Sequence, residues 1–459
     1  MKNLAIFLLT VMAGCSNSEQ NSNSDNSEVK LITLDPGHFH AALVQKTMYP
    51  GVDSVVHVYA PLGADLQLHV DRINSYNIRT ENPTKWKEEI YTGNDFLEKM
   101  LNEKKGNVVV MSGNNRKKTE YILQAVEKGF NVLADKPMAI DKKNFELLKT
   151  AFATAEKNNV LLYDIMTERY EITTMLQREF SQQPEVFGQL EKGTADNPAI
   201  TKESVHHFYK YVSGNILTRP PWFMDVTQEG EGITDVTTHL VDLVQWECFP
   251  EQIINYEKDV HLLTARRWTT DMTISQFNAV TKLNGFPDYL KKDVVNDSIL
   301  KIYCNGEISY QLKDIHAKVS VIWAYKAPDG TGDTHYSIMR GTKANLVIRQ
   351  GAEQKYKPVL YIEPVDRSNN SFETVLTNQL KSIQSKYPGV ELTKTATGWE
   401  VTIPEKYKEG HEAHFARVTE KFLQYFKDKK MPDWEVPNML SKYYTTTAAL
   451  ELATKSGSK

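Results

Sequence analysis

Short apolar runs alternate with amphipathic segments through residues 29–165, and this alternation constrains the fold more than any other feature of the chain. The predicted strands are 29–34, 52–59, 108–110, 131–134 and 160–164, and the predicted helices are 41–48, 94–101, 118–128 and 142–158. Strands that are separated by helices are joined by right-handed crossovers and lie parallel. The pattern therefore predicts an α/β domain with a doubly wound parallel sheet over residues 29–165.

The remaining residues, 166–459, show longer polar loops and strands without intervening helices. The predicted strands are 252–256, 298–304, 307–312, 318–325, 336–339 and 344–350, and two predicted helices, 411–427 and 438–453, close the chain. Strands that follow one another directly favour antiparallel pairing. We therefore expect an α+β domain with a mainly antiparallel open sheet and C-terminal helices.

The first 28 residues predict export and attachment to a membrane. Residues 1–14 contain Lys2 followed by an apolar run. This run is too short to span a bilayer, and the pattern is typical of a signal peptide. The residues before Cys15, Val11-Met12-Ala13-Gly14, resemble a bacterial lipobox, which makes Cys15 the lipidated first residue. Residues 15–28 have the composition of a disordered tether. We expect an exported bacterial lipoprotein, anchored at the periplasmic face or the cell surface; a plain secreted protein is the alternative.

The charge balance argues against a nucleic-acid partner. The chain has 54 Lys and Arg residues against 58 Asp and Glu residues, a net charge of −4. Such a balance offers no basic field that could hold a phosphate backbone. Nucleic acid is therefore not an expected partner.

The turn Asp35-Pro36-Gly37-His38-Phe39-His40 stands where a Rossmann-like domain places its glycine-rich phosphate-binding turn. Only one of the three glycines is present. Gly37 would let the backbone approach a pyrophosphate at the start of the following helix, beside His38, Phe39 and His40. An ordinary strand-to-helix turn is the alternative. No acidic residue for the ribose ends the second predicted strand, so the choice between NAD and NADP stays open.

A more specific motif follows the fourth predicted strand. Asp135-Lys136-Pro137 resembles the Glu-Lys-Pro motif of the Gfo/Idh/MocA (glucose-fructose oxidoreductase and inositol dehydrogenase) family, with Asp135 in place of Glu. The upstream strand, the turn with Asn114 and the helix after it are also similar to this family. A strand end places the Lys136 ammonium at the sheet edge where open α/β sheets bind ligands. The resemblance implies that Asn114, Asp135 and Lys136 contact the cofactor; a solvated strand-end lysine is the alternative.

Residues 230–243 resemble the glycine-rich loop of the same family and the helix after it, with Asp235 and His239 four residues apart. This spacing places both side chains on one face of a helix. The resemblance implies that His239 transfers the proton, while Asp235 and Lys136 position the substrate and tune the imidazole. A histidine satisfied by the neighbouring aspartate is the alternative.

Two other segments contain candidate residues. Residues 166–180 resemble the segment that leaves the nucleotide domain of the family, which makes Arg169 and Tyr170 candidate substrate-binding residues; an ordinary interdomain helix is the alternative. His411 and His414 have helical spacing without a third ligand nearby, so we expect no metal site.

The resemblance implies an oxidoreductase, in lipoprotein form, that uses NAD or NADP on a secondary alcohol of a sugar or glycoside. An exported protein meets little free dinucleotide, so the cofactor is expected to be tightly bound and recycled. Two alternatives stay open: redox-assisted glycoside cleavage through a keto-sugar intermediate, and a non-catalytic glycan-binding lipoprotein. We expect a sugar or glycan-derived partner and a membrane contact through the lipid, and a homo-oligomer stays open.

Overall fold

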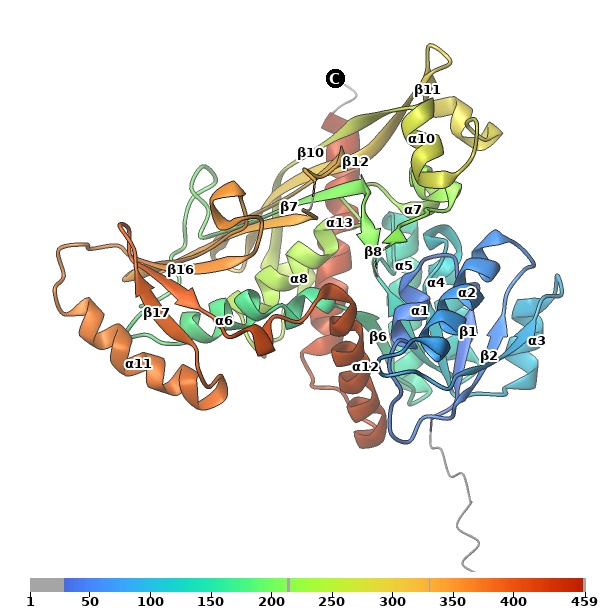
Figure 1. Cartoon of the computed structure of the whole chain (residues 1–459), viewed down its shortest axis with the longest axis horizontal. Coiled ribbons are helices and arrows are strands. Elements are labelled where there is room, and N and C mark those ends of the chain that lie inside the picture. Colours follow the sequence, from blue (N-terminus) through green and yellow to red (C-terminus); the bar gives the residue numbers. More distant parts are fainter. Residues whose placement is uncertain (1–28, 213–214, 330, 457–459) are drawn as a thin grey trace, which may run out of the picture.

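The computed structural model describes residues 29–212, 215–329 and 331–456, and a parallel sheet comes first in the chain (Figure 1). Within these residues this sheet has six strands in the order β3-β2-β1-β4-β5-β6, all paired parallel. They are β1 (Leu31–Leu34), β2 (Val55–Tyr59), β3 (Lys87–Tyr91), β4 (Val108–Met111), β5 (Asn131–Asp135) and β6 (Leu162–Ile165). The helices between them are α1 (His40–Val44), α2 (Ala64–Ile78), α3 (Phe96–Glu103), α4 (Asn115–Glu127) and α5 (Lys142–Lys157). The predicted doubly wound sheet is confirmed.

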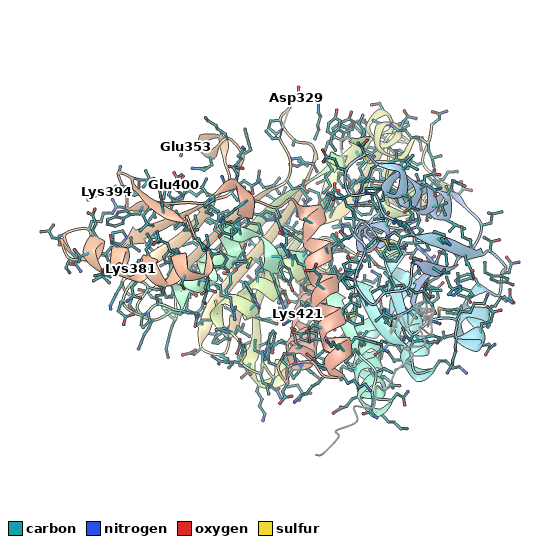
Figure 2. All side chains as sticks on the ribbon, turned by 60° about the horizontal axis from the view of Figure 1, so that its bottom comes forward. Asp329, Glu353, Lys381, Lys394, Glu400 and Lys421 are labelled. Atoms are coloured by element: carbon teal, nitrogen blue, oxygen red, sulfur yellow. The ribbon has the colours of Figure 1, made fainter. Side chains whose placement is uncertain are left out.

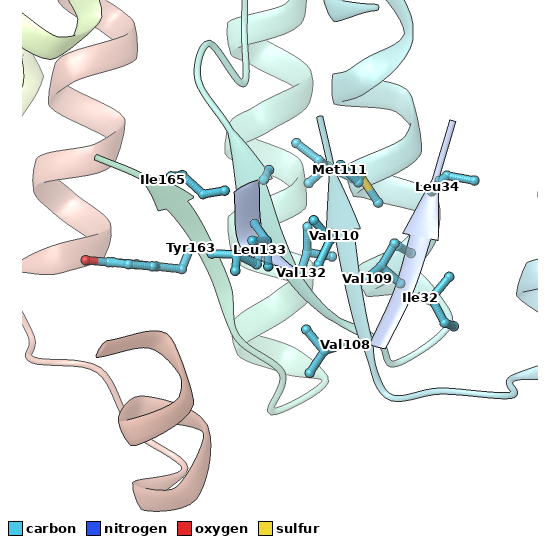
Figure 3. Packing of buried hydrophobic residues seen from close by; sticks show 14 of the residues in the cluster. Ile32, Leu34, Val108, Val109, Val110, Met111, Val132, Leu133, Tyr163 and Ile165 are labelled. Carbon is cyan, nitrogen blue, oxygen red and sulfur yellow. The ribbon is translucent and has the colours of Figure 1, made fainter. Parts of the chain in front are cut away.

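Buried β-branched and aliphatic side chains explain why the central strands could be predicted. Every residue of β1 and β4 is buried, and Figure 3 shows Val109 and Val110 between Ile32 on one side and Leu133 on the other. A parallel sheet that helices cover on both faces requires such continuous apolar runs. The edge strand β3 is polar and mostly exposed, so neither it nor the long polar helix α2 gave a pattern that the sequence analysis recognised.

The second sheet is mixed and mostly antiparallel, as predicted. In the described residues it has ten strands in the order β10-β12-β13-β7-β14-β15-β16-β18-β17, with β11 on β12, and only β13 and β7 pair parallel. They are β7 (Ile200–Tyr209), β10 (Val260–Thr273), β11 (Val294–Val295), β12 (Ile299–Leu312), β13 (Ile315–Lys326), β14 (Thr334–Arg340), β15 (Ala344–Arg349), β16 (Val359–Pro364), β17 (Glu391–Lys394) and β18 (Trp399–Thr402). A separate hairpin joins β8 (Tyr211–Val212) to β9 (Asn215–Ile216).

One face of this sheet packs on helices. Its helices are α6 (Ile172–Ser181), α7 (Val226–Glu229), α8 (Thr237–Cys248), α9 (Tyr256–Asp259), α10 (Ile274–Thr281) and α11 (Phe372–Lys386), with 3-10 turns η1 (Thr167–Tyr170), η2 (Pro221–Met224), η3 (Asp288–Asp293), η4 (Ala352–Gln354) and η5 (Glu405–Tyr407). Leu176 of α6 and Val241 of α8 share a buried core with Val319 of β13. Figure 2 shows Glu353 and Lys394 on the outer surface.

Two predicted strand assignments in this domain are wrong. Residues 252–256 form a loop that leads into α9, where the Asn255 side chain caps the helix by accepting hydrogen bonds from two backbone N–H groups. The predicted strands 298–304 and 307–312 are one strand, β12, because Gly306 does not break it. A side chain at Gly306 would lie 2.7 Å from Ile233, so this glycine lets another loop pack closely on the strand.

The two C-terminal helices, α12 (His411–Asp428) and α13 (Glu435–Ser456), pack on the first domain as well as on the second. Phe415 and Phe422 of α12 and Tyr443 of α13 belong to the buried core of the parallel sheet, and Figure 1 shows α13 standing between the two sheets. The fully buried Lys442 ammonium lies 2.7 Å from an Asp164 oxygen in β6 and 2.8 Å from an Asp242 oxygen in α8. The end of the chain therefore joins the two domains.

The predicted signal peptide, Cys15 and the tether lie outside the described residues. Within the described part of the chain, no helix combines the length and the apolar composition that a membrane span requires.

Candidate active site

Lys136 and Asp235 meet across the boundary between the two domains. Lys136 follows β5 at the carboxyl edge of the parallel sheet, and its ammonium donates a hydrogen bond to the Asp235 carboxylate. Both side chains are largely buried. Burial acts to lower the pKa of Lys136, but the carboxylates of Asp235 and Asp135 outweigh it and raise the pKa. The ammonium is therefore held charged inside the protein.

His239 lies in the first turn of α8 and lines the same small cavity of about 60 Å³ as Lys136 and Asp235. Its Nδ1 atom is buried and has no hydrogen-bond partner among the described residues. Burial, followed by the charge of Lys136, lowers the pKa of His239 to about 3. The imidazole is therefore neutral at ordinary pH.

The loop before α8 differs from the expectation in one respect. Helix α8 begins at Thr237, so Asp235 lies in the turn before it, and Asp235 and His239 line the same cavity. The glycine of this loop, Gly232, approaches the backbone of β12: a Cβ there would lie 1.8 Å from the Cys304 carbonyl oxygen. The loop is glycine-rich because it packs on a strand, and this packing brings Asp235 to Lys136.

Asp135 is buried beneath the turn that follows β1. Its Oδ2 atom accepts a hydrogen bond from Ser112 Oγ at 3.0 Å and lies 2.9 Å from His40 Nδ1 and 3.3 Å from His38 Nδ1. Burial acts to raise the pKa of Asp135, but the neighbouring imidazoles of His40 and His38 and the Lys118 ammonium hold it well below its usual range. The turn and the strand end therefore form one polar cluster.

A larger cavity of about 630 Å³ opens beside this cluster, between the second sheet and the N-terminus of α12. Polar side chains from both domains line it, including Lys46, Glu168, Glu203, His206, Asp333 and His411. Phe39, Glu168, His206 and His411 also line the small cavity with Lys136 and His239. The candidate catalytic groups thus lie at one end of a polar cavity with the volume of a small-molecule site.

Two family models match the chain. "Oxidoreductase family, NAD-binding Rossmann fold", the Gfo/Idh/MocA model, matches residues 69–164, and "Putative oxidoreductase C terminal domain" matches residues 176–454. A crystal structure from Parabacteroides merdae, titled a putative oxidoreductase, is 59% identical over 94% of this chain and 98% of its own, with a TM-score of 0.92. The chain belongs to the Gfo/Idh/MocA family of oxidoreductases. It is an NAD(P)-binding member of that family, as the resemblance implied.

More distant structures share the fold of this family member. A structure of a putative oxidoreductase from Thermotoga maritima is 14% identical, covers 94% of this chain and 98% of its own, and has a TM-score of 0.59. Levoglucosan dehydrogenase in complex with NADH and levoglucosan is 11% identical, with 93% and 97% coverage and a TM-score of 0.60. None of the curated proteins that were compared with the chain matches it.

The turn at Gly37 does not leave open space for the phosphates of a dinucleotide. The backbone N–H groups of Gly37 and His38 both donate to the Ser112 carbonyl, at 3.2 Å each. Trp222 of η2 lies against the turn, with Cζ2 only 3.0 Å from the position of a Cβ on Gly37, and its Nε1 donates to Asp65 Oδ2 at 2.7 Å. The space beside the turn is about 10 Å³. A pyrophosphate therefore fits this turn only when Trp222 is displaced.

Asn114 lies at the contact between the domains. Its side chain caps α4 by accepting a hydrogen bond from the Arg116 backbone N–H, and it donates to Gln228 of α7 at 2.7 Å. If Asn114 binds the cofactor, it does so from a position where its side chain contacts both domains.

Arg169 and Tyr170, the candidate substrate-binding residues, line neither of the two cavities described above. Arg169 is buried and donates to both oxygens of Asp242 at 2.7 Å and to Glu435 of α13. Tyr170 packs against the core of the parallel sheet. The Arg169 guanidinium is thus held between α8 and α13, and the substrate-binding role of both residues stays a prediction.

Glu168 is a site residue that the sequence analysis missed. It lines both cavities, and one of its oxygens lies 3.2 Å from His411 Nδ1. Burial acts to raise the pKa of Glu168, but His411 holds it well below its usual range. The only signal in the sequence was its position directly before Arg169, which does not distinguish a site residue from a surface acid.

Proposed function

We propose that the protein transfers a hydride between NAD or NADP and a secondary alcohol of a sugar or glycoside bound in the polar cavity. The observation that carries this proposal is the meeting of Lys136, Asp235 and His239 at one end of that cavity. Levoglucosan dehydrogenase, whose structure contains NADH and a sugar derivative, shares the fold and supports the substrate class. Carboxylates and imidazoles along the cavity suit a ligand rich in hydroxyl groups.

In this proposal His239 is the general base. Its neutral imidazole accepts the proton of the substrate hydroxyl as the hydride leaves the same carbon atom. The Lys136 ammonium stabilises the negative charge that develops on the oxygen, and Asp235 holds the ammonium in place. The nicotinamide, when bound, supplies the hydride acceptor.

The cofactor is proposed to lie across the turn from Gly37 to His40, with Asn114, Asp135 and Lys136 nearby. This placement requires the displacement of Trp222 that the geometry of the turn demands. The displacement costs free energy, so a tightly bound and recycled dinucleotide has to gain that free energy from its other contacts in the site.

Turnover assays with His239→Gln and Lys136→Met test this proposal. The substrates are a panel of sugars and methyl glycosides, with formation of keto product and of reduced cofactor as readouts. Both variants should lose turnover and keep their circular dichroism spectra, while the matched control His57→Gln, on an outer strand, should keep turnover. Unchanged turnover in both active-site variants would contradict the assignment. Glycan binding without turnover by the unsubstituted protein would favour the non-catalytic alternative.

We also propose that the protein is an exported lipoprotein attached through Cys15. The lipobox-like residues before Cys15 support this proposal. The variant Cys15→Ser should leave the membrane fraction and should no longer incorporate a labelled fatty acid. Membrane attachment that persists in this variant would show a different anchor.

A further inference from the structure

We propose that His38, His40 and Asp135 bind a divalent transition-metal ion such as Zn²⁺. The three side chains converge at the carboxyl edge of the parallel sheet, where the turn after β1 meets the end of β5. In the described part of the chain they are the one group of three such side chains whose ligand atoms come together in this way. This inference goes beyond the proposed function, which needs no metal ion.

The distances match a metal site. The ligand atoms His38 Nδ1, His40 Nδ1 and Asp135 Oδ2 all lie within 4.8 Å of one another. Asp135 Oδ2 is 2.9 Å from His40 Nδ1 and 3.3 Å from His38 Nδ1. Around a tetrahedral ion with bonds of about 2.0 to 2.1 Å, neighbouring ligand atoms lie about 3.3 Å apart. A small outward movement of His40 would therefore open the site for an ion.

Hydrogen bonding alone leaves part of this cluster unexplained. Asp135 Oδ2 already accepts from Ser112 Oγ and pairs with His40. The buried His38 Nδ1 lies 3.3 Å from the same oxygen and interacts with it electrostatically, but it lacks the geometry of a well-formed hydrogen bond. A buried polar atom without a partner is costly. A metal ion would use the lone pair of this atom and remove the cost.

Aromatic packing orients the imidazole rings toward Asp135. The His40 ring contacts Phe415 of α12, with ring centroids 4.6 Å apart, and the His38 ring stacks on Phe223 at 6.1 Å. Ligands that are held in place before binding lose little entropy when the ion arrives. These contacts come from both domains, so the two imidazoles are oriented by the whole fold.

Charged groups of both signs surround the cluster, and the carboxylate of Asp135 is the ligand that would offset part of the charge of an ion. The ammonium groups of Lys118 and Lys136 are close, but each has its own acceptor: Lys118 donates to the Asp135 carbonyl and Lys136 to the Asp235 carboxylate. Asp235 supplies negative charge in the same region, whereas burial raises the pKa of Glu229 well above its usual range, and the Arg219 guanidinium adds positive charge near His38. Two imidazoles and one carboxylate form a ligand set that Zn²⁺ and similar ions prefer.

The open side of the proposed site faces the candidate active site. His38 and His40 line the small cavity together with Lys136, Asp235 and His239. An ion with three protein ligands keeps a coordination position for water or a substrate oxygen. The ion would thus present a polarised oxygen to the groups that move the proton.

The experiment measures metal binding directly. The protein is treated with a chelator, separated from it, and titrated with Zn²⁺ by calorimetry, and the stoichiometry is checked by elemental analysis. One ion should bind per chain. The variants His40→Gln and Asp135→Asn should each weaken binding by at least 100-fold. His57→Gln, which changes a histidine of β2 that pairs with Glu89, should leave the affinity unchanged.

A second measurement, made on the unsubstituted protein, tests the proposal even if the variants fail to fold. Crystals of the unsubstituted protein soaked in Zn²⁺ should show an anomalous-scattering peak between His38, His40 and Asp135. The absence of uptake, an affinity that folded variants leave unchanged, or a peak elsewhere would overturn the proposal. None of these readouts depends on turnover, so failure of the metal site is distinguishable from failure of the proposed oxidoreductase function.

Discussion

Removal of the Trp222 side chain should tighten the binding of NAD or NADP. In the structure this ring covers Gly37 and is 8% exposed, and its Nε1 donates to the Asp65 carboxylate. A dinucleotide that lies across the turn must break this hydrogen bond and move the ring. The unsubstituted protein therefore binds with an affinity that is reduced by the free energy of this displacement.

The expected change in the dissociation constant follows from the hydrogen bond between Trp222 and Asp65. A hydrogen bond to a charged group contributes about 1.5–3 kcal/mol. Since each 1.4 kcal/mol changes an equilibrium constant tenfold, loss of this bond alone should lower the dissociation constant by about 10- to 100-fold. Trp222→Phe removes the bond and keeps an aromatic ring, whereas Trp222→Ala also removes the ring from the turn. We expect the dissociation constant to fall in Trp222→Phe and to fall further in Trp222→Ala.

Calorimetric titration with NAD and NADP, on protein stripped of bound nucleotide, measures both variants. Trp246→Ala is the matched control because Trp246 packs on Arg178, away from the turn. Circular dichroism shows that the variants remain folded. If folded Trp222→Ala binds both dinucleotides no more tightly than the unsubstituted protein, Trp222 does not occupy the phosphate site and the placement of the cofactor is refuted.

Three further predictions concern the buried ionisable side chains of His239 and Arg169. If His239 accepts the proton of the substrate, His239→Ala should lower kcat by about 10²- to 10⁴-fold in steady-state assays with the identified substrate. An unchanged kcat would contradict this role of His239. The low pKa of His239, about 3, means that the unfolded chain takes up a proton near pH 6.5 that the folded chain does not. Stability should therefore fall as the pH drops from 6.5 toward 3, and His239→Gln should flatten this fall in melting temperature. Arg169→Met should destabilise the fold by about 3–5 kcal/mol in urea unfolding, because it leaves Asp242 and Glu435 buried without their partner; a loss within error of zero would refute this.

The parallel sheet could be predicted because its signal is local. Residues 108–111 are all apolar and all buried, and a helix follows each such run. The exposed edge strand β3, with the sequence Lys-Glu-Glu-Ile-Tyr, carries no such signal. Residues 298–304 and 307–312 were predicted as two strands, and the role of Gly306 between them is tertiary: it makes room for Ile233, a residue far away in the sequence.

The candidate site was predicted only in part, because part of its geometry also depends on tertiary contacts. Lys136, Asp235 and His239 belong to motifs that can be read along the chain, and the structure brings them to one cavity. The position of Trp222 over Gly37 depends on how the two domains meet, which no local pattern encodes. Arg169 was expected in the site, but Asp242 and Glu435, from two later helices, bind its guanidinium instead.

The packing of α12 and α13 on the parallel sheet has a consequence for the order in which the protein folds. A chain that is synthesised from its N-terminus exposes β6 long before Phe422 and Tyr443, which cover it, have been made. Until then the first domain lacks part of its core, so it cannot reach its final stability as an independent unit. The contacts that complete it are among the most distant in the sequence, and they close late. Residues of α12 and α13 thus complete the first domain, and a nascent chain stays incompletely folded until these two helices have been synthesised.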